Sequence, residues 1–351
     1  MRVLMTGHLG YIGTVAVPLF QEGGHEVTGC DTDLYRACTF GKDLGPAGGI
    51  RNLGLDIRDV TADHLRGFDA VVHYGGIPND PLGDLDPEVT MQINTEATVS
   101  LARAAKAAGV PRFVFSSSCS NYGAAGENFL DEQGAFNPVT AYGRSKVAAE
   151  KGLLPLADDR FSPVLMRSAT AFGVSPRLRF DLVINNLTAW ACATGDILLK
   201  SDGTPWRAVV HIEDIARAFR AVVEAPRDLV HAEAFNVGST SENYQIQELA
   251  RMVEQVVPGT QVRFAEGAGP DLRSYRVNCD KLARVFPHAA PRWTARMGVE
   301  QLHEAFQAHG VSKEEFEGPR FQRKAHVLGH IASGALTQAL RWAPQRAARV
   351  A

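Results

Sequence analysis

The first half of the chain alternates short apolar runs with longer stretches in which apolar residues recur every three or four positions. Short runs rich in valine and phenylalanine predict buried β-strands, and the longer periodic stretches predict amphipathic helices. The predicted strands cover residues 2–5, 26–30, 70–73, 112–116 and 162–167, and the predicted helices cover residues 11–21, 62–66, 87–108 and 141–156. Apolar strands that alternate with helices are typical of a parallel sheet covered on both faces. We therefore predict an α/β fold with a doubly wound parallel sheet of the Rossmann type.

The pattern changes after about residue 170, where helices are separated by loops rich in proline and glycine and by short strands. These later helices are predicted at residues 180–194, 212–224, 246–256 and 298–308. We predict two domains. The Rossmann domain covers residues 1–170, with segments near 205–240 that return to it, and a smaller α+β substrate-binding domain covers residues 171–351.

The chain ends in a basic tail that starts at residue 318 and contains no acidic residue. Its basic residues are Arg320, Arg323, Lys324, Arg341, Arg346 and Arg349. The simplest interpretation is two short helices that pack back on the domain and end in a frayed terminus. Contact with a nucleotide phosphate or with a partner subunit is the alternative.

Composition narrows the possible classes of protein. The 351 residues carry a net charge of −3, and 45% of them are hydrophobic, which is ordinary for a globular protein and argues against a nucleic-acid or membrane partner. No apolar run approaches the roughly 20 residues that span a bilayer. The five cysteines are scattered, which predicts free thiols in a reducing compartment and no cysteine-based metal site. We therefore expect a cytoplasmic protein without a metal ion.

The stretch MTGHLGYIG places Gly7, Gly10 and Gly13 directly after the first predicted strand, at the start of the first helix. The first glycine permits a tight turn, the second lets the backbone approach a pyrophosphate, and the third lets the helix pack closely on the strand. Tyr11 and Ile12 lie between the last two glycines, where the helix N-terminus offers free N–H groups to phosphates. This loop predicts a dinucleotide-binding site.

Asp31 follows the second predicted strand. A carboxylate at this position accepts hydrogen bonds from the adenosine ribose and repels a 2′-phosphate, which favours NAD over NADP. Asp33 is close enough to share this task, although an exposed loop acid is the simpler interpretation. Asp56 and Ile57, in GLDIRD, are placed to bracket the adenine.

Tyr142 and Lys146 are four residues apart in AYGRSKVAAE, so a helix places both side chains on one face. A free tyrosine has a pKa near 10, and a neighbouring ammonium group together with a positive nicotinamide favours the phenolate that could act as a base. The pair alone is common on surface helices. It becomes informative together with the glycine loop and the strand end FVFSSSCSNYG, which carries Ser118.

These motifs together resemble the extended short-chain dehydrogenases/reductases, the family of NAD-dependent nucleotide-sugar epimerases and dehydratases, and most closely its UDP-galactose 4-epimerases. The shared motifs are T-G-x-x-G-x-x-G at 6–13, Asp31, Asp56-Ile57, the serines at 116–118, Tyr142/Lys146 and FNVG at 235–238. The resemblance implies that Ser118 holds the reacting hydroxyl group, that Tyr142 is the base, and that Lys146 also binds the nicotinamide ribose. HYGG at 73–76 departs from the usual H-x-A-A and puts Tyr74 beside the cofactor.

The same resemblance implies contacts to a nucleotide-diphosphate sugar. VINNL matches the segment whose asparagine meets the sugar diphosphate, here Asn186, and WRAVVHIED and PDLRSYRV match segments with phosphate-facing arginines, here Arg207 and Arg273. A helix cap for Asn186 and structural ion pairs for the arginines are the alternatives. Asn79, in the unfamiliar loop PNDPLGD, and Ser120 are further candidate sugar contacts.

The residues after Ser118 favour one reaction. Dehydratases of the resembled family carry Thr-Asp-Glu there, whereas this chain has Ser118-Cys119-Ser120-Asn121, without a carboxylate to move a proton. We predict an epimerase that oxidises the sugar at C4 and returns the hydride to the opposite face. A dehydrogenase or reductase, and a dehydratase with its acid elsewhere, such as Asp80 or Glu127, stay open, and a non-catalytic NAD sensor is a remote alternative.

The predicted helices at 87–108 and 141–156 have alanine-rich faces. In the resembled family the corresponding helices form a dimer interface, which predicts a homodimer. The alternative is that these alanines pack on the sheet.

Overall fold

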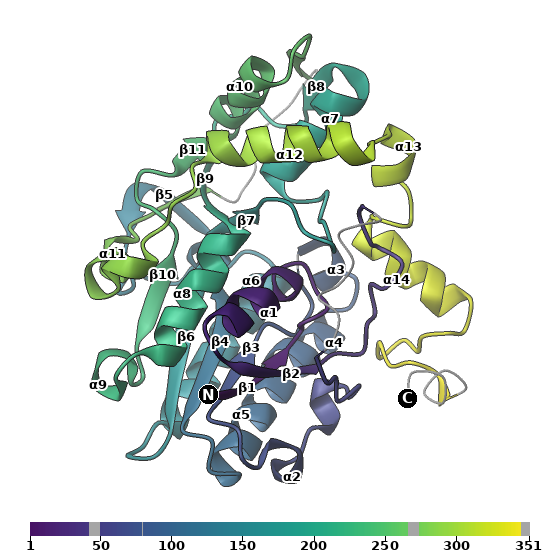
Figure 1. Cartoon of the computed structure of the whole chain (residues 1–351). Coiled ribbons are helices and arrows are strands. Elements are labelled where there is room, and N and C mark those ends of the chain that lie inside the picture. The colour runs from purple at the N-terminus through teal and green to yellow at the C-terminus, as the bar shows by residue number, and fades with distance from the viewer. Residues whose placement is uncertain (42–49, 79, 266–273, 345–351) are drawn as a thin grey trace.

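A computed structural model describes residues 1–41, 50–78, 80–265 and 274–344 (Figure 1). Its centre is a six-stranded sheet with the order β10-β6-β4-β3-β1-β2, in which every neighbouring pair is parallel. The strands are β1 (Arg2–Thr6), β2 (Glu26–Cys30), β3 (Ala70–His73), β4 (Arg112–Ser118), β6 (Ser162–Ser168) and β10 (Ala234–Val237). The predicted α/β fold with a doubly wound parallel sheet is confirmed.

Helices cover both faces of this sheet, and alternate strand residues contact them. Val3 and Met5 of β1 belong to a buried cluster with helices α1 (Gly13–Glu22) and α8 (Ile212–Glu224). Leu4, between them, belongs to a second cluster on the opposite face. The helices of that face are α2 (Ala62–Leu65), α5 (Thr98–Ala107) and α6 (Ala141–Leu153). The strands are therefore apolar on both sides, as the sequence pattern indicated.

The helix predicted over residues 87–108 is not α-helical throughout. It consists of α4 (Pro87–Met91), a π-helical turn at Gln92–Ala97, and α5. In the π-helical turn, the side-chain amide of Asn94 accepts a hydrogen bond from the Ile77 nitrogen (2.7 Å) and donates one to the Ile77 carbonyl (3.1 Å). Such π-helical turns are frequent at functional sites.

A second region lies above the carboxyl ends of the strands (Figure 1). Its long helices are α7 (Val183–Thr194), α10 (Ile246–Val256) and α12 (Ala295–His309), which pack on one another around Phe180 and Phe306. Three small sheets accompany them: β11-β9-β7, β12-β8 and β13-β5. These strands are β5 (Ala124–Leu130), β7 (Thr170–Phe172), β8 (Asp196–Leu199), β9 (Trp206–His211), β11 (Asn243–Gln245), β12 (Gln261–Phe264) and β13 (Ser274–Val277). The division of the chain into domains at residue 170 stays a prediction.

The basic tail differs from its prediction of two short helices. Within the described residues after Gly318 it forms one helix, α14 (Arg323–Ala332), which contacts the short helix α3 (Asp80–Gly83). The other short helices are α9 (Arg227–Val230), α11 (Asp280–Val285) and α13 (Lys313–Phe316). Among the described residues, no helix combines the length and apolar character that crossing a membrane requires.

Candidate functional site

The glycine loop forms a cradle at the carboxyl end of β1. Gly7 has a φ of +71°, a left-handed conformation that glycine adopts without strain. A Cβ atom on Gly13 would lie 2.3 Å from the Gly7 carbonyl oxygen, and one on Gly7 would lie 2.7 Å from the Gly75 nitrogen. Side chains are thus excluded where the loop turns and where α1 meets β1. The loop therefore fits a dinucleotide pyrophosphate, as predicted.

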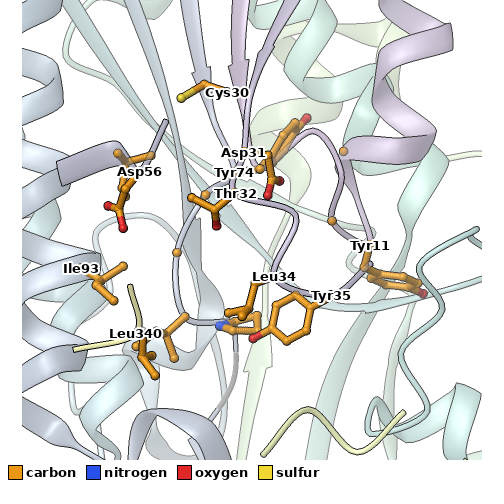
Figure 2. A pocket seen from close by; sticks show the side chains of 18 of the residues that line it. Tyr11, Cys30, Asp31, Thr32, Leu34, Tyr35, Asp56, Tyr74, Ile93 and Leu340 are labelled. Atoms are coloured by element: carbon orange, nitrogen blue, oxygen red, sulfur yellow. The ribbon is translucent and has the colours of Figure 1, made fainter. Parts of the chain in front are cut away.

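One pocket contains every predicted cofactor contact except Lys146. These lining residues are Gly7, Gly10, Tyr11, Ile12, Gly13, Asp31, Asp56, Ile57 and Tyr74. Figure 2 shows Asp31 and Asp56 on one side of the pocket and Tyr35 and Leu340 on the other. The ring of Tyr74 packs against Phe219 of α8, with ring centroids 4.6 Å apart. Tyr74 is therefore anchored on the α8 side of the sheet.

The Asp31 carboxylate, which lines this pocket, is held by two backbone N–H groups. It accepts hydrogen bonds from the backbone nitrogens of Asp33 (2.7 Å) and Leu9 (3.2 Å). Burial raises the pKa of Asp31 to about 6, and these two N–H groups partly oppose that shift. Ribose hydroxyl groups would offer further donors to the ionised carboxylate, which is the role predicted for Asp31.

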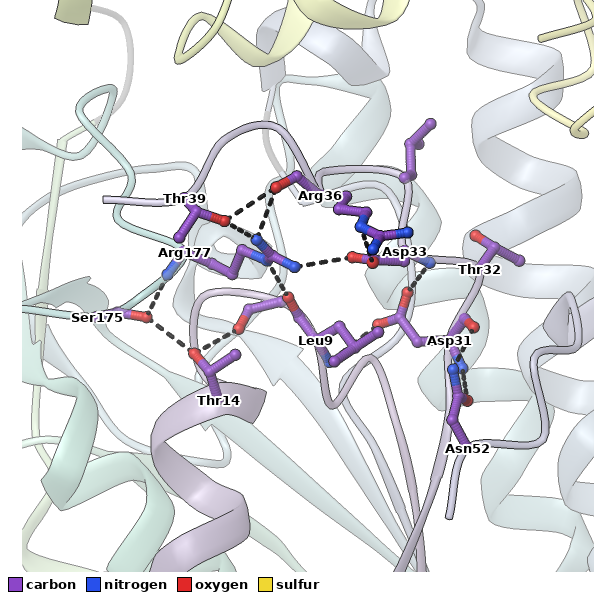
Figure 3. A network of polar contacts seen from close by, with 12 residues as sticks. Leu9, Thr14, Asp31, Thr32, Asp33, Arg36, Thr39, Asn52, Ser175 and Arg177 are labelled. Atoms are coloured by element: carbon purple, nitrogen blue, oxygen red, sulfur yellow. Dashed lines mark hydrogen bonds and ion pairs between the residues drawn. The ribbon is translucent and has the colours of Figure 1, made fainter. Parts of the chain in front are cut away.

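Arg177, which the sequence analysis missed, joins the loop after β2 to the glycine loop (Figure 3). Its guanidinium donates to the carbonyls of Leu9 (3.1 Å) and Arg36 (2.8 Å) and pairs with Asp33 (2.9 Å). Asp33 therefore serves an ion pair and is only partly exposed. Arg177 is 168 residues from Leu9 in the chain, so no local motif could have predicted this contact.

The structure brings the three predicted catalytic residues together. Tyr142 and Lys146 lie on α6, whose N-cap is Thr140, and Ser118 ends β4. Burial raises the pKa of Tyr142 to about 12, while a hydrogen bond with the Ser118 side chain lowers it. The Lys146 ammonium donates to the Ser116 carbonyl at 2.8 Å, and burial lowers its pKa to about 8. This arrangement can hold a hydroxyl group between Ser118 and Tyr142.

The charge of Arg179 acts on Tyr142. The buried guanidinium of Arg179 lowers the pKa of Tyr142, whereas the Asp80 carboxylate raises it. Arg179 is paired with Asp181 at 2.7 Å and also lines the cofactor pocket. No motif predicts this role, because Arg179 lies in a loop after β7 without a recognisable sequence pattern.

The residues after Ser118 are oriented in different directions. The Cys119 thiol is fully buried and contacts the Arg167 carbonyl, and the Asn121 amide donates to Ser117 and Glu150. Ser120 is only partly buried and forms a hydrogen bond with the Tyr275 side chain. Of the three residues, only Ser120 has a partly exposed side chain for a substrate contact.

Two acids were named as alternative proton donors. Asp80, at the start of α3, accepts a hydrogen bond from the Thr140 hydroxyl at 2.7 Å, and its charge is felt at Tyr142. The side chain of Glu127 lies outside the described part of the molecule. Asp80 is therefore a carboxylate near the predicted base, although it lies far from Ser118 in the sequence.

The predicted substrate contacts are less clearly grouped. The Asn186 amide donates to the Phe180 carbonyl (2.8 Å), and the Arg207 guanidinium donates to the Trp206 carbonyl (2.8 Å) above the Tyr275 ring. Asn79 and Arg273 lie outside the described residues. The roles of all four residues in substrate binding stay predictions.

The alanine-rich faces on α5 and α6 are only partly buried, because Ala104 and Ala148 are half-buried and Ala107 is exposed. Ala102, Ala105 and Ala149 are fully buried within one chain, in the cluster that packs on the sheet. Their presence is therefore explained without a partner subunit.

Comparison with known proteins places the chain in a family. Residues 3–238 match the NAD dependent epimerase/dehydratase family, so the chain belongs to it, and the predicted NAD cofactor is confirmed.

Individual relatives point the same way. UDP-glucose 4-epimerase from Bacillus subtilis is 25% identical over 86% of this chain and 94% of its own length. The structure of MoeE5 with UDP-glucose and NAD is 26% identical, covers 88% of this chain and 99% of its own, and has a TM-score of 0.75. A dTDP-glucose 4,6-dehydratase from Streptomyces venezuelae shares the fold at 23% identity, with coverage of 91% and 100% and a TM-score of 0.77.

Proposed function

We propose that this protein is an NAD-dependent epimerase that inverts C4 of a nucleotide-diphosphate sugar. The observation that carries the proposal is the grouping of Ser118, Tyr142 and Lys146, combined with the lack of a carboxylate at positions 119–121. The curated relative from Bacillus subtilis, which matches along most of the chain, supports epimerisation.

The residues divide the work of the reaction. Tyr142, as phenolate, takes the proton of the C4 hydroxyl group, and the Ser118 hydroxyl holds that oxygen in place. Burial alone disfavours the phenolate, whereas the Arg179 cation lowers the pKa of Tyr142. The Lys146 ammonium, 5.8 Å from the centre of the Tyr142 ring, and the positive nicotinamide of a bound NAD would lower it further. NAD, when bound, accepts the hydride from C4 and gives it back, so no net oxidation occurs. After the sugar turns over in the site, Tyr142 returns the proton to the new hydroxyl group.

The sugar nucleotide would lie on the side of Tyr142 away from the adenosine pocket. Asn186, Arg207 and Arg273 are proposed to bind its diphosphate, and Asn79 and Ser120 its sugar. Arg207 supports this role because it is a 7% exposed cation at the end of β9 nearest β13, where Tyr275 contacts Ser120. We also propose a homodimer and a cytoplasmic location.

A dehydratase is the second candidate, because Asp80 supplies a carboxylate close to Tyr142. Removing water across C5–C6 needs a group that moves a proton at C5, and an acid on a different element could do this. Asp80→Asn separates the two candidates, since it should stop water loss but leave C4 inversion measurable.

The proposed function is tested by incubating the protein with UDP-glucose, UDP-galactose and dTDP-glucose, followed by product NMR and nicotinamide absorbance. Epimerisation predicts an equilibrium mixture of C4 epimers, with neither water loss nor accumulated NADH. Water loss would favour the dehydratase, and NADH formed in proportion to product would favour a dehydrogenase.

A further inference from the structure

The C-terminal tail lies across the adenosine side of the cofactor pocket, and we call residues 320–343 the C-terminal cover. Trp342 donates from its indole nitrogen to the Thr32 carbonyl at 2.7 Å. Arg58, which lines the pocket, donates to the carbonyl of Ala339 at 2.7 Å. The side chain of Leu340 itself lines the pocket (Figure 2). The cover is therefore a wall of the cofactor site.

The other end of the cover is fastened to the loop after β2. Arg320 donates to the carbonyls of Ala37 (2.9 Å) and Thr39 (2.5 Å), and His326 contacts the carbonyl of Leu34 at 3.1 Å. This loop begins at Asp31, the residue proposed to bind the ribose. The loop after β2 would therefore contact both the C-terminal cover and the ribose of the bound cofactor.

Arg323, the first residue of α14, is a buried cation of the cover that has no ion-pair partner among the described residues. It is 3% exposed and lines the cofactor pocket. Its guanidinium lies 4.0 Å from the centre of the Tyr35 ring, and Nη2 donates to the Arg177 carbonyl at 3.1 Å. Nε and Nη1 have no hydrogen-bond partner among the described residues.

The groups around Arg323 leave its charge uncompensated. Cys38, whose thiol shares a hydrogen bond with the Arg323 side chain, and Tyr35 are neutral neighbours. Asp181 is already paired with Arg179. Among the described residues, no carboxylate forms an ion pair with Arg323. A buried cation without an anion is costly, so an anionic ligand is the partner that this geometry lacks.

We propose that Arg323 binds the diphosphate of the dinucleotide cofactor and that the C-terminal cover thereby clamps the cofactor in place. The glycine loop and Arg323 line the same pocket. One diphosphate could therefore accept hydrogen bonds both from the backbone N–H groups of the loop and from the guanidinium of Arg323. This proposal favours the alternative interpretation of the basic tail, in which the tail contacts a nucleotide phosphate. It does not depend on which sugar reaction the protein catalyses.

The test compares Arg323→Met with Lys324→Met, which removes the same charge from the exposed neighbour on the same helix. Binding of NAD, ADP and adenosine to the full chain is measured by titration calorimetry after removal of any co-purified NAD. Because charge-assisted hydrogen bonds are lost, we expect Arg323→Met to lower the affinity for NAD and for ADP by about tenfold to a hundredfold. The affinity for adenosine, which has no phosphate, should change by less than about twofold. Lys324→Met should leave the affinities for NAD, ADP and adenosine unchanged.

Two results would overturn the proposal. One is an unchanged NAD affinity in Arg323→Met, and the other is an equal loss for adenosine and NAD, which would indicate a purely structural role. Arg323→Lys, which keeps the charge, should lose less affinity than Arg323→Met. Should Arg323→Met not fold, trypsin cleavage of the unaltered chain provides the test: NAD and ADP should slow cleavage at Arg320 and Arg341 more than adenosine does, and equal rates would contradict the clamp.

Discussion

The cofactor half of the site and the sugar half are built in different ways. The cofactor half lies on the first strands of the sheet, and its predicted contacts, Lys146 apart, line a single pocket. The sugar half draws on β9, α7 and loops far apart in the sequence. Two of its five predicted binding residues, Asn186 and Arg207, donate hydrogen bonds to nearby carbonyls. Binding a dinucleotide relies on backbone geometry that short motifs encode, whereas sugar recognition relies on side chains that only the fold brings together.

The largest expected effect lies where the two halves meet. Tyr142→Phe removes the proposed base, and we expect turnover to fall by about a thousandfold or more. NAD affinity should change by less than about threefold, because the ring and its packing remain. Steady-state kinetics and NAD titration measure the two effects separately, and substantial remaining turnover would exclude Tyr142 from the chemistry.

In the cofactor half, Gly13→Ala should damage the fold and NAD binding together. The new Cβ atom would lie 2.3 Å from a backbone oxygen, so strain should lower stability by about 1–3 kcal/mol. Gly329→Ala is the matched control, because nothing lies within 4 Å of that Cβ and helix propensity favours alanine. Urea unfolding and NAD titration of both variants check this. A stable Gly13→Ala variant with normal NAD affinity would contradict the claim that the glycine loop excludes a side chain at position 13.

In the sugar half, Arg207→Met should raise the KM for the sugar nucleotide by about tenfold or more, through loss of charge-assisted hydrogen bonds to the diphosphate. NAD affinity should stay unchanged. If Arg207 only supports the structure around Trp206, the melting temperature would fall while the KM of the remaining folded enzyme stayed the same. Kinetics together with thermal unfolding distinguish these outcomes.

The smallest effect expected is a pH dependence in the cofactor half. Because the pKa of Asp31 is raised to about 6, its carboxyl group is protonated below that pH and ionised above it. The ribose hydroxyls donate to the ionised form, so NAD affinity should rise from about pH 5 to pH 7 and then level off. Asp31→Asn should lower the affinity for NAD about tenfold and remove its increase with pH. Exposed Asp63→Asn is the control, and an unchanged pH profile in Asp31→Asn would assign the titration elsewhere.

The same contrast explains what the sequence could predict. The sheet, its helices and the glycine loop follow from local periodicity and from the spacing of Gly7, Gly10 and Gly13. Arg177 and Arg179 reach the site from segments more than 140 residues away from Asp31, and no local pattern marks them. Arg323 belongs to the basic tail, for which contact with a nucleotide phosphate is only the alternative interpretation. The π-helical turn at Gln92–Ala97 was missed because the apolar periodicity of residues 87–108 predicts one continuous helix.

The central claim, hydride removal and return at C4, is tested most directly by running the reaction with UDP-glucose, UDP-galactose and dTDP-glucose in deuterated water. In an epimerase of this kind, every carbon-bound hydrogen stays on the sugar or the cofactor, whereas water removal across C5–C6 exchanges the hydrogen at C5 with solvent. The account predicts inversion at C4 without deuterium in the product. Deuterium at C5 in a product that has lost water would contradict it.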